Sequence, residues 1–126
     1  MNLKNLMVIK AVVCLVLGLP ILLLTVPFYT LFGATLAPGG IFAAREYGAS
    51  LVGNMLLTWF ARKAVDSDAR RAIILGLCVY DAIGFIVTLI SIFTGALGPL
   101  GWFAAAVYLF FALGFGYFLL PSKKAA

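Results

Sequence analysis

The chain has 126 residues, of which 65% are hydrophobic and 10% are charged, and its formal net charge is +5. Soluble globular proteins average roughly half apolar residues and about a quarter charged residues. A soluble domain of this length could not bury so much apolar surface. The composition therefore excludes an ordinary soluble domain and predicts an integral membrane protein.

Four apolar runs follow one another along the chain, separated by short loops. Each has the roughly 20 residues that a helix needs to cross about 30 Å of hydrocarbon. None alternates polar and apolar residues as the strands of a membrane barrel do. The sequence thus predicts an all-α fold in one domain (1–126), an antiparallel bundle of four transmembrane helices. The predicted spans are 11–32, 41–61, 72–93 and 100–120.

The basic residues lie on one side of the predicted membrane. Eight of the nine fall before the first span, between the second and third spans, or after the fourth; Arg45 is the exception. Under the positive-inside rule, both termini are cytoplasmic. This placement explains the basic excess without a nucleic-acid partner. The eight residues are Lys4, Lys10, Arg62, Lys63, Arg70, Arg71, Lys123 and Lys124.

The chain offers little for metal or redox chemistry. It has no histidine, and its two cysteines, Cys14 and Cys78, stand alone in apolar runs. A Cys-x-x-C pair or a histidine would be needed for the commonest redox, haem and metal sites. Nothing in the sequence pairs a nucleophile with a base. We therefore expect no cofactor, no metal and no enzymatic activity.

The second run, 41–61, is the most polar of the four spans. It contains the adjacent charges Arg45 and Glu46 together with Ser50, Asn54 and several small residues. Neighbours on a helix point about 100° apart, so these two charges cannot pair closely with each other. Either both reach the outer interface, or Arg45 turns inward and holds a carboxylate or phosphate.

Asp81 is predicted to lie near the middle of the third span. At about 1.5 Å per residue its depth lies between those of Asn54 and Ser50 on the second span, and Tyr108 also comes within reach. We expect a hydrogen bond from Asp81 to Asn54 or Ser50. Two interpretations stay open: Asp81 binds a proton, a cation or a polar headgroup, or it is a neutral contact between helices.

Several local features predict where helices bend, begin and approach one another. Pro20 should kink the first span, and Met1–Lys10 should lie at the cytoplasmic interface. Ser67 followed by Asp68 is typical of a helix N-terminus. Small residues at helical spacing should allow close helix contacts: Ala49 with Gly53, Gly76 with Gly84, and Ala112 with Gly116.

Part of the chain resembles a group of small bacterial four-helix inner-membrane proteins that have no assigned activity. The resemblance rests on the segment 45–62 (REYGASLVGNMLLTWFAR), on RRAIILG at the start of the third span, and on the late GW and LFFALGFGYF motifs. It implies the four-helix fold and a multi-pass location in a bacterial inner membrane. It implies no activity.

The sequence favours a non-enzymatic membrane protein, either an accessory or scaffold subunit that packs against partner helices or a protein that binds a lipid-like ligand. The alternative is a small proton- or cation-coupled transporter or channel that uses Asp81. We expect membrane lipids as partners, and either a homo-oligomer or a larger membrane complex. The predicted polar interior or ligand site comprises Arg45, Glu46, Ser50, Asn54, Tyr80, Asp81 and Tyr108.

Overall fold

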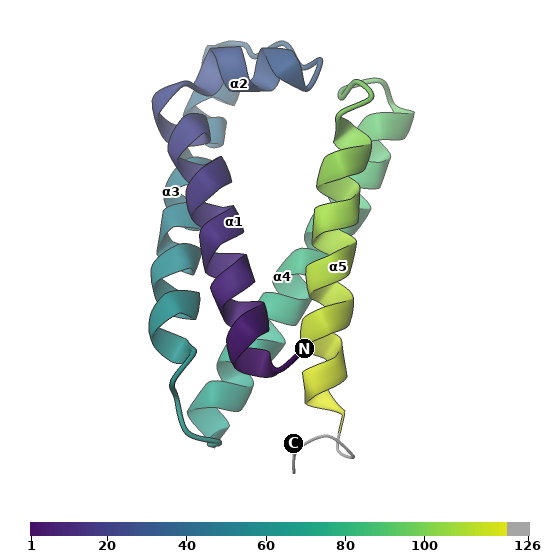
Figure 1. Ribbon diagram of the computed structural model, residues 1–126. Helices are drawn as coiled ribbons and strands as arrows, with labels where there is room; N and C mark the ends of the chain where they lie inside the picture. The colour runs from purple at the N-terminus through teal and green to yellow at the C-terminus, as the bar shows by residue number, and fades with distance from the viewer. Residues whose placement is uncertain (121–126) are drawn as a thin grey trace.

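The computed structural model describes residues 1–120, and this part of the chain forms five helices (Figure 1). The helices are α1 (Leu3–Leu23), α2 (Thr25–Leu31), α3 (Pro38–Ala61), α4 (Asp68–Phe93) and α5 (Gly101–Leu119). The predicted all-helical fold is confirmed. Three of the helices, α1, α4 and α5, are long and apolar enough to cross a membrane. Lys123 and Lys124, which we predicted to lie on the cytoplasmic side, are outside the described residues.

The first predicted span, 11–32, is not one helix. Helix α1 begins at Leu3, continues through Pro20 and ends at Leu23, where the chain leaves helical geometry at Leu24 (φ −126°, ψ 51°). Helix α2 then runs across the end of the molecule (Figure 1).

Pro27 explains where this helix breaks. A proline ring clashes with the carbonyl group four residues before it, and for Pro27 that residue is Leu23, the last of α1. Proline is tolerated in the first turn of a helix, which is its place in α2. The hydroxyl of Thr25 donates to the Ile21 carbonyl at 2.6 Å and so satisfies a group at the end of α1.

The start of the third long helix agrees with the sequence. Ser67 precedes α4 in extended geometry, and its hydroxyl accepts a hydrogen bond from the Arg70 amide at 3.2 Å. Asp68 occupies the first turn, where a negative charge interacts favourably with the helix dipole. The predicted N-terminus of this helix is confirmed, and it begins four residues before the apolar run.

The four long helices form two pairs. Helix α1 packs along α3, and α4 packs along α5, whereas the largest backbone contact between the pairs, that of α1 with α5, is much smaller. Glycines allow the α1–α3 approach: a Cβ on Gly48 would lie 2.9 Å from the Leu22 amide nitrogen, and one on Gly18 would lie 3.0 Å from the Leu51 Cβ. The predicted contacts at Gly53 and Gly76 are absent, since a Cβ at either position would meet nothing within 4 Å.

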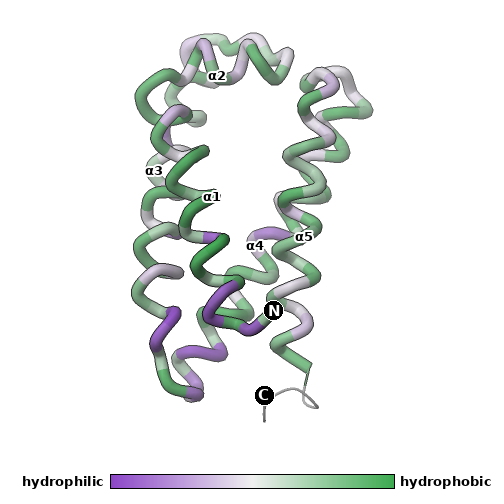
Figure 2. The backbone as a smooth tube through the Cα atoms, viewed as in Figure 1, coloured by the Kyte–Doolittle hydropathy of each residue, from purple (hydrophilic) through white to green (hydrophobic). Residues whose placement is uncertain are grey.

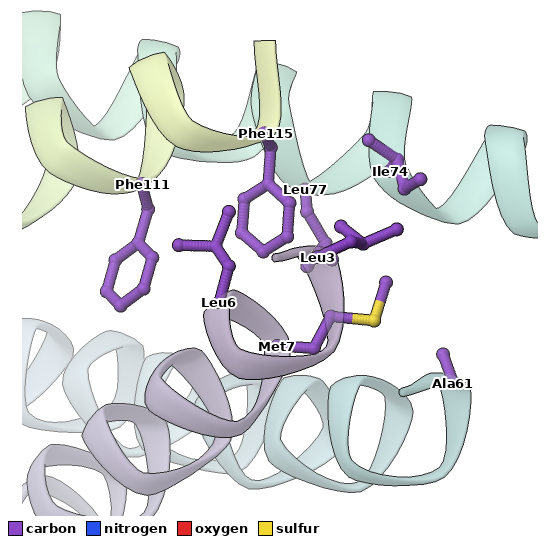
Figure 3. Packing of buried hydrophobic residues seen from close by; sticks show 8 residues of the cluster. All are labelled: Leu3, Leu6, Met7, Ala61, Ile74, Leu77, Phe111 and Phe115. Carbon is purple, nitrogen blue, oxygen red and sulfur yellow. The ribbon is translucent and has the colours of Figure 1, made fainter. Parts of the chain in front are cut away.

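The two pairs share an apolar core at the end of the molecule that contains the N-terminus (Figure 3). Leu6 of α1 lies against the stacked rings of Phe111 and Phe115, which are 6.2 Å apart. Residues 3–10 therefore belong to a packed helix that continues without a break into the first apolar run. The buried members of this core are Leu3, Leu6, Met7, Ala61, Ile74, Leu77, Phe111 and Phe115.

The hydrophilic part of the chain gathers at the same end. The most hydrophilic stretches are the start of α1 and the loop between α3 and α4, whereas the long helices are mainly hydrophobic (Figure 2). Many large apolar side chains point outward, including Val16 (61% exposed), Ile83 (56%) and Leu113 (65%). So many exposed apolar side chains on long apolar helices are typical of a protein surrounded by lipid.

Candidate functional site: a cavity between the helix pairs

A cavity of about 140 Å³ lies between the two helix pairs. Every helix contributes to its wall, and most of the lining side chains are apolar or aromatic. An apolar cavity of about 150 Å³ is large enough to hold a benzene-sized molecule. The aromatic residues of the lining are Phe28, Tyr29, Phe32, Tyr47, Phe103 and Tyr108.

An ion pair between Lys10 and Asp81 borders the cavity and joins the two pairs of helices. The Lys10 ammonium of α1 donates a hydrogen bond to Oδ1 of Asp81 on α4 at 2.5 Å. Both residues are buried, with 3% of Lys10 and none of Asp81 exposed. A lone charge at this position would be very costly, so each residue makes burial of the other possible.

Our prediction of the hydrogen-bond partner of Asp81 is wrong. Neither Asn54 nor Ser50 bonds its carboxylate, which pairs with Lys10, a residue predicted to flank the membrane. Lys10 lies on the buried face of α1 because the inward positions recur at helical spacing. These inward positions are Leu3, Leu6, Met7, Lys10, Ala11, Cys14, Gly18 and Ile21. This spacing could have indicated from the sequence that Lys10 points inward. The prediction missed it because the first predicted span begins at residue 11, directly after Lys10.

Two aromatic rings lie close to the ammonium group of Lys10. Its nitrogen lies 4.8 Å from the ring centre of Phe111 and 5.2 Å from that of Tyr80, distances at which the ring faces attract a cation. The second carboxylate oxygen of Asp81 is buried and has no hydrogen-bond partner in the described residues. The Tyr80 hydroxyl is likewise buried without a hydrogen-bond partner within residues 1–120.

A second polar contact crosses the cavity further from the N-terminal end. The hydroxyl groups of Tyr47 on α3 and Tyr108 on α5 are hydrogen-bonded to each other. Tyr108 can reach this position because Gly84 has no side chain: a Cβ at Gly84 would lie 2.4 Å from its ring. The predicted close contact at Gly84 is therefore confirmed, and it serves to place Tyr108.

The short helix α2 covers the far end of the cavity. Its residues Phe28 and Tyr29, and Phe32 just beyond it, line the cavity, and the rings of Phe28 and Phe32 stack at 5.0 Å. The Phe32 carbonyl accepts a hydrogen bond from the Gly98 amide at 2.7 Å. Because Gly98 belongs to the loop between α4 and α5, this bond connects the two pairs at the end opposite their shared core.

The fold brings only some of the predicted site residues to the cavity. Asp81 and Tyr108 line the cavity, and Tyr80 lies beside it against Lys10. Arg45, Glu46 and Ser50 are exposed on α3, and Asn54 is half-buried there; none of the four lines the cavity. The sequence interpretation missed Lys10, Tyr47 and the aromatic residues of α2, because their roles depend on contacts between distant segments.

No protein-family model, curated protein or solved structure matches this chain.

Proposed function

We propose that this protein is a small integral membrane protein that binds the apolar part of a lipid-like molecule in the cavity between its helix pairs. The observation that carries the proposal is the cavity itself, which is lined mainly by apolar and aromatic side chains and bordered by a neutral ion pair. Binding sites for small molecules are generally concave and mostly apolar, with few polar groups. A hydrocarbon chain or a small ring fits this lining.

The proposal includes four membrane crossings, with α3 as the fourth. Helix α3 has 24 residues, which gives a length of about 36 Å. It packs along α1, which is long and apolar enough to cross the membrane. Two helices packed along their length occupy the same depth. Cytoplasmic termini and a bacterial inner membrane, which rest on the basic residues and on the sequence resemblance, belong to the same proposal.

The ion pair favours ligand binding over the proton- or cation-coupled alternative. A cation site needs a negative charge that is free to meet the cation. Lys10 already compensates the charge of Asp81, and no part of Asp81 is exposed to solvent. An apolar ligand requires no change in this pair. A role as accessory subunit is compatible with the same cavity, since a ligand between the helix pairs leaves the outward apolar side chains free to pack against partner helices.

Photolabelling of the cavity tests the proposal. The purified full-length protein is irradiated with a fatty alcohol that carries a diazirine on its chain, and the labelled residues are mapped by mass spectrometry. Ala104 lines the cavity, whereas Ala106 on the same helix is exposed outside it. Ala104→Phe should fill the cavity and reduce labelling of its lining, and Ala106→Phe should leave that labelling unchanged.

The proposal fails if the label is found only on outward-facing residues, or if both phenylalanine variants reduce labelling of the lining equally. In the first case the alcohol reports general contact with lipid. In the second case the substitutions act on the fold and not on the cavity. Circular dichroism of both variants establishes that each keeps the helical content of the natural chain.

A further inference from the structure

We propose that the N-terminal end of the molecule carries a binding site for the phosphate of an anionic membrane lipid. A second cavity, of about 300 Å³, lies there between the start of α1, the end of α3, the start of α4 and the end of α5. Three basic residues from different parts of the chain line it: Lys4, Arg62 and Arg70. This site is separate from the apolar cavity; it rests on the proposed membrane topology and not on ligand binding in that cavity.

The charged residues that line this second cavity are all basic. Its described lining contains these three basic residues and no acidic residue. The lining also includes Asn2 and Tyr117, and its apolar wall includes Leu3 and Phe118. A phosphate group in this cavity would therefore meet positively charged side chains, with apolar surface beside it. Basic pockets between helices at the cytoplasmic side of a membrane bind lipid headgroups in this way.

The two arginines are held in place by contacts that leave donors for a ligand. The Arg62 guanidinium lies 3.8 Å from the ring centre of Trp59 and donates one hydrogen bond to the Trp59 carbonyl. Arg70 donates to the Ala64 carbonyl at 3.3 Å. A guanidinium has five N–H donors in a planar fork that matches a phosphate. Each arginine is thus oriented by the protein and retains donors for phosphate oxygens.

A lipid phosphate fits better than a free phosphate because of the surroundings. Trp59 and Tyr117 are aromatic residues near this end, and such residues are enriched at the level of lipid headgroups. The exposed apolar surface of the long helices begins next to the cavity and could accept the acyl chains. The two sources share the same phosphate chemistry, and the experiment below separates them.

The test is native mass spectrometry of the full-length protein in detergent, titrated with phosphatidylglycerol or with phosphatidylcholine of the same acyl chains. We expect retention of the anionic lipid only. Arg62→Gln and Arg70→Gln should each weaken retention about fivefold, the effect of one basic residue at an anionic surface. Lys63→Gln is the matched control, since Lys63 neighbours Arg62, is exposed and does not line the cavity.

Three results would overturn the proposal. If Lys63→Gln weakened retention as much as the arginine variants, general surface charge would account for binding. If the arginine variants retained phosphatidylglycerol fully, the cavity would not hold the lipid. If excess inorganic phosphate displaced the lipid completely, the site would take free phosphate. Retained helicity by circular dichroism in each variant excludes unfolding as the cause.

A separate observation concerns the exposed face of α3 and points to a second copy of this chain as the partner that packs against this face. Arg45 and Glu46 are both exposed, and no ion pair is found for either within residues 1–120. Ala49 and Gly53 fall between them on the helical wheel, at about 100° per residue. Charged residues on a lipid-facing surface are costly unless they are paired.

A two-fold axis along the membrane normal would pair these charges. Both copies insert in the same orientation, so α3 of one protomer runs parallel to α3 of its partner. Arg45 on one flank then faces Glu46 of the partner subunit on the opposite flank, and the same contact repeats across the axis. Gly53 has open space around it, so the backbones can approach closely at this point.

Fluorescence energy transfer between labelled copies in liposomes tests this interface. We expect dimers whose dissociation constant rises about tenfold in Arg45→Glu and in Gly53→Leu. The double exchange Arg45→Glu with Glu46→Arg restores the pairing and should return the dissociation constant close to that of the natural chain. Gly76→Leu is the control, because Gly76 is an exposed helical glycine with nothing within 4 Å on the other helix pair.

A monomeric natural chain in liposomes would refute this interface. So would a double exchange that dimerises as poorly as Arg45→Glu alone, since the reversed charges should pair equally well. An equal effect of Gly76→Leu and Gly53→Leu would show that association does not use the α3 face.

Discussion

Single residues connect the two helix pairs, and the Lys10–Asp81 ion pair is the most demanding of these contacts. It joins residues 71 positions apart, both almost completely buried. Transfer of two charges from water to an apolar interior costs several kcal/mol per ion, which mutual attraction offsets only when the geometry is good. The pair therefore specifies how the helix pairs meet more than it stabilises them.

Removal of one partner should be far more harmful than removal of both. We expect Lys10→Met to lower the free energy of unfolding by about 3–5 kcal/mol, because Asp81 then lies buried without its partner. Lys10→Met combined with Asp81→Leu should recover most of that loss. Unfolding of the detergent-solubilised variants by sodium dodecyl sulfate, followed by circular dichroism, measures both. Equal stability of the single and double variants would contradict the ion pair.

A substitution at Gly84 tests the second contact between the helix pairs, the hydrogen bond between Tyr47 and Tyr108. A methyl group at Gly84 would lie 2.4 Å from the Tyr108 ring, so Gly84→Ala must displace the ring and weaken its bond to Tyr47. We expect a loss of about 1–3 kcal/mol in the free energy of unfolding. Gly76→Ala is the matched control, and with nothing within 4 Å it should gain up to about 1 kcal/mol from helix propensity. Similar results for the two variants would exclude a specific role of Gly84.

At the scale of elements, prolines and caps decide where helices begin and end. Pro27 prevents the first apolar run from being one helix, and the short helix that results, α2, covers the cavity. A prediction from hydropathy alone joins the two helices, because residues on both sides of the break are apolar. Thus a local steric effect within one run creates the end wall of the candidate site.

The cap at Ser67 provides a test at this scale. Ser67→Ala removes the side-chain acceptor of the Arg70 amide, and we expect the free energy of unfolding to fall by about 1 kcal/mol. Ser91→Ala is the control, because Ser91 donates to the Val87 carbonyl within an exposed stretch of α4, where loss of the hydroxyl costs little. A Ser67 variant as stable as the control would show that the cap does not contribute.

At the scale of the whole molecule, the arrangement is two helix pairs held together at three levels. An apolar core closes the N-terminal end, the ion pair and the tyrosine contact cross the middle, and one backbone hydrogen bond from Gly98 to Phe32 connects the far end. The cavity exists because the pairs make their main shared core at one end only. A single bundle packed along its whole length would leave less room.

The proposed four-span topology predicts opposite accessibility of two loops. In a background with Cys14→Ala and Cys78→Ala, Asp66→Cys tests the loop after α3 and Ala96→Cys tests the loop after α4. A membrane-impermeant maleimide added outside intact cells should label position 96 and not position 66, with lysed cells as the control for reactivity. Labelling of both positions from outside would refute this topology.

The sequence alone determined the membrane class, the helical fold and the start of α4, because hydropathy and capping are properties of neighbouring residues. It also drew attention to Asp81 and Tyr108, since polar groups in apolar runs are visible without a structure. Only the tertiary structure decided that Asp81 meets Lys10, that Tyr47 meets Tyr108, and that Arg45 and Glu46 face outward. These outcomes depend on how helices rotate and pair, which is set by contacts such as those of Gly18, Gly48 and Gly84 between segments far apart in the chain. Hydropathy fixes the depth of a residue in the membrane, but packing fixes the direction in which its side chain points.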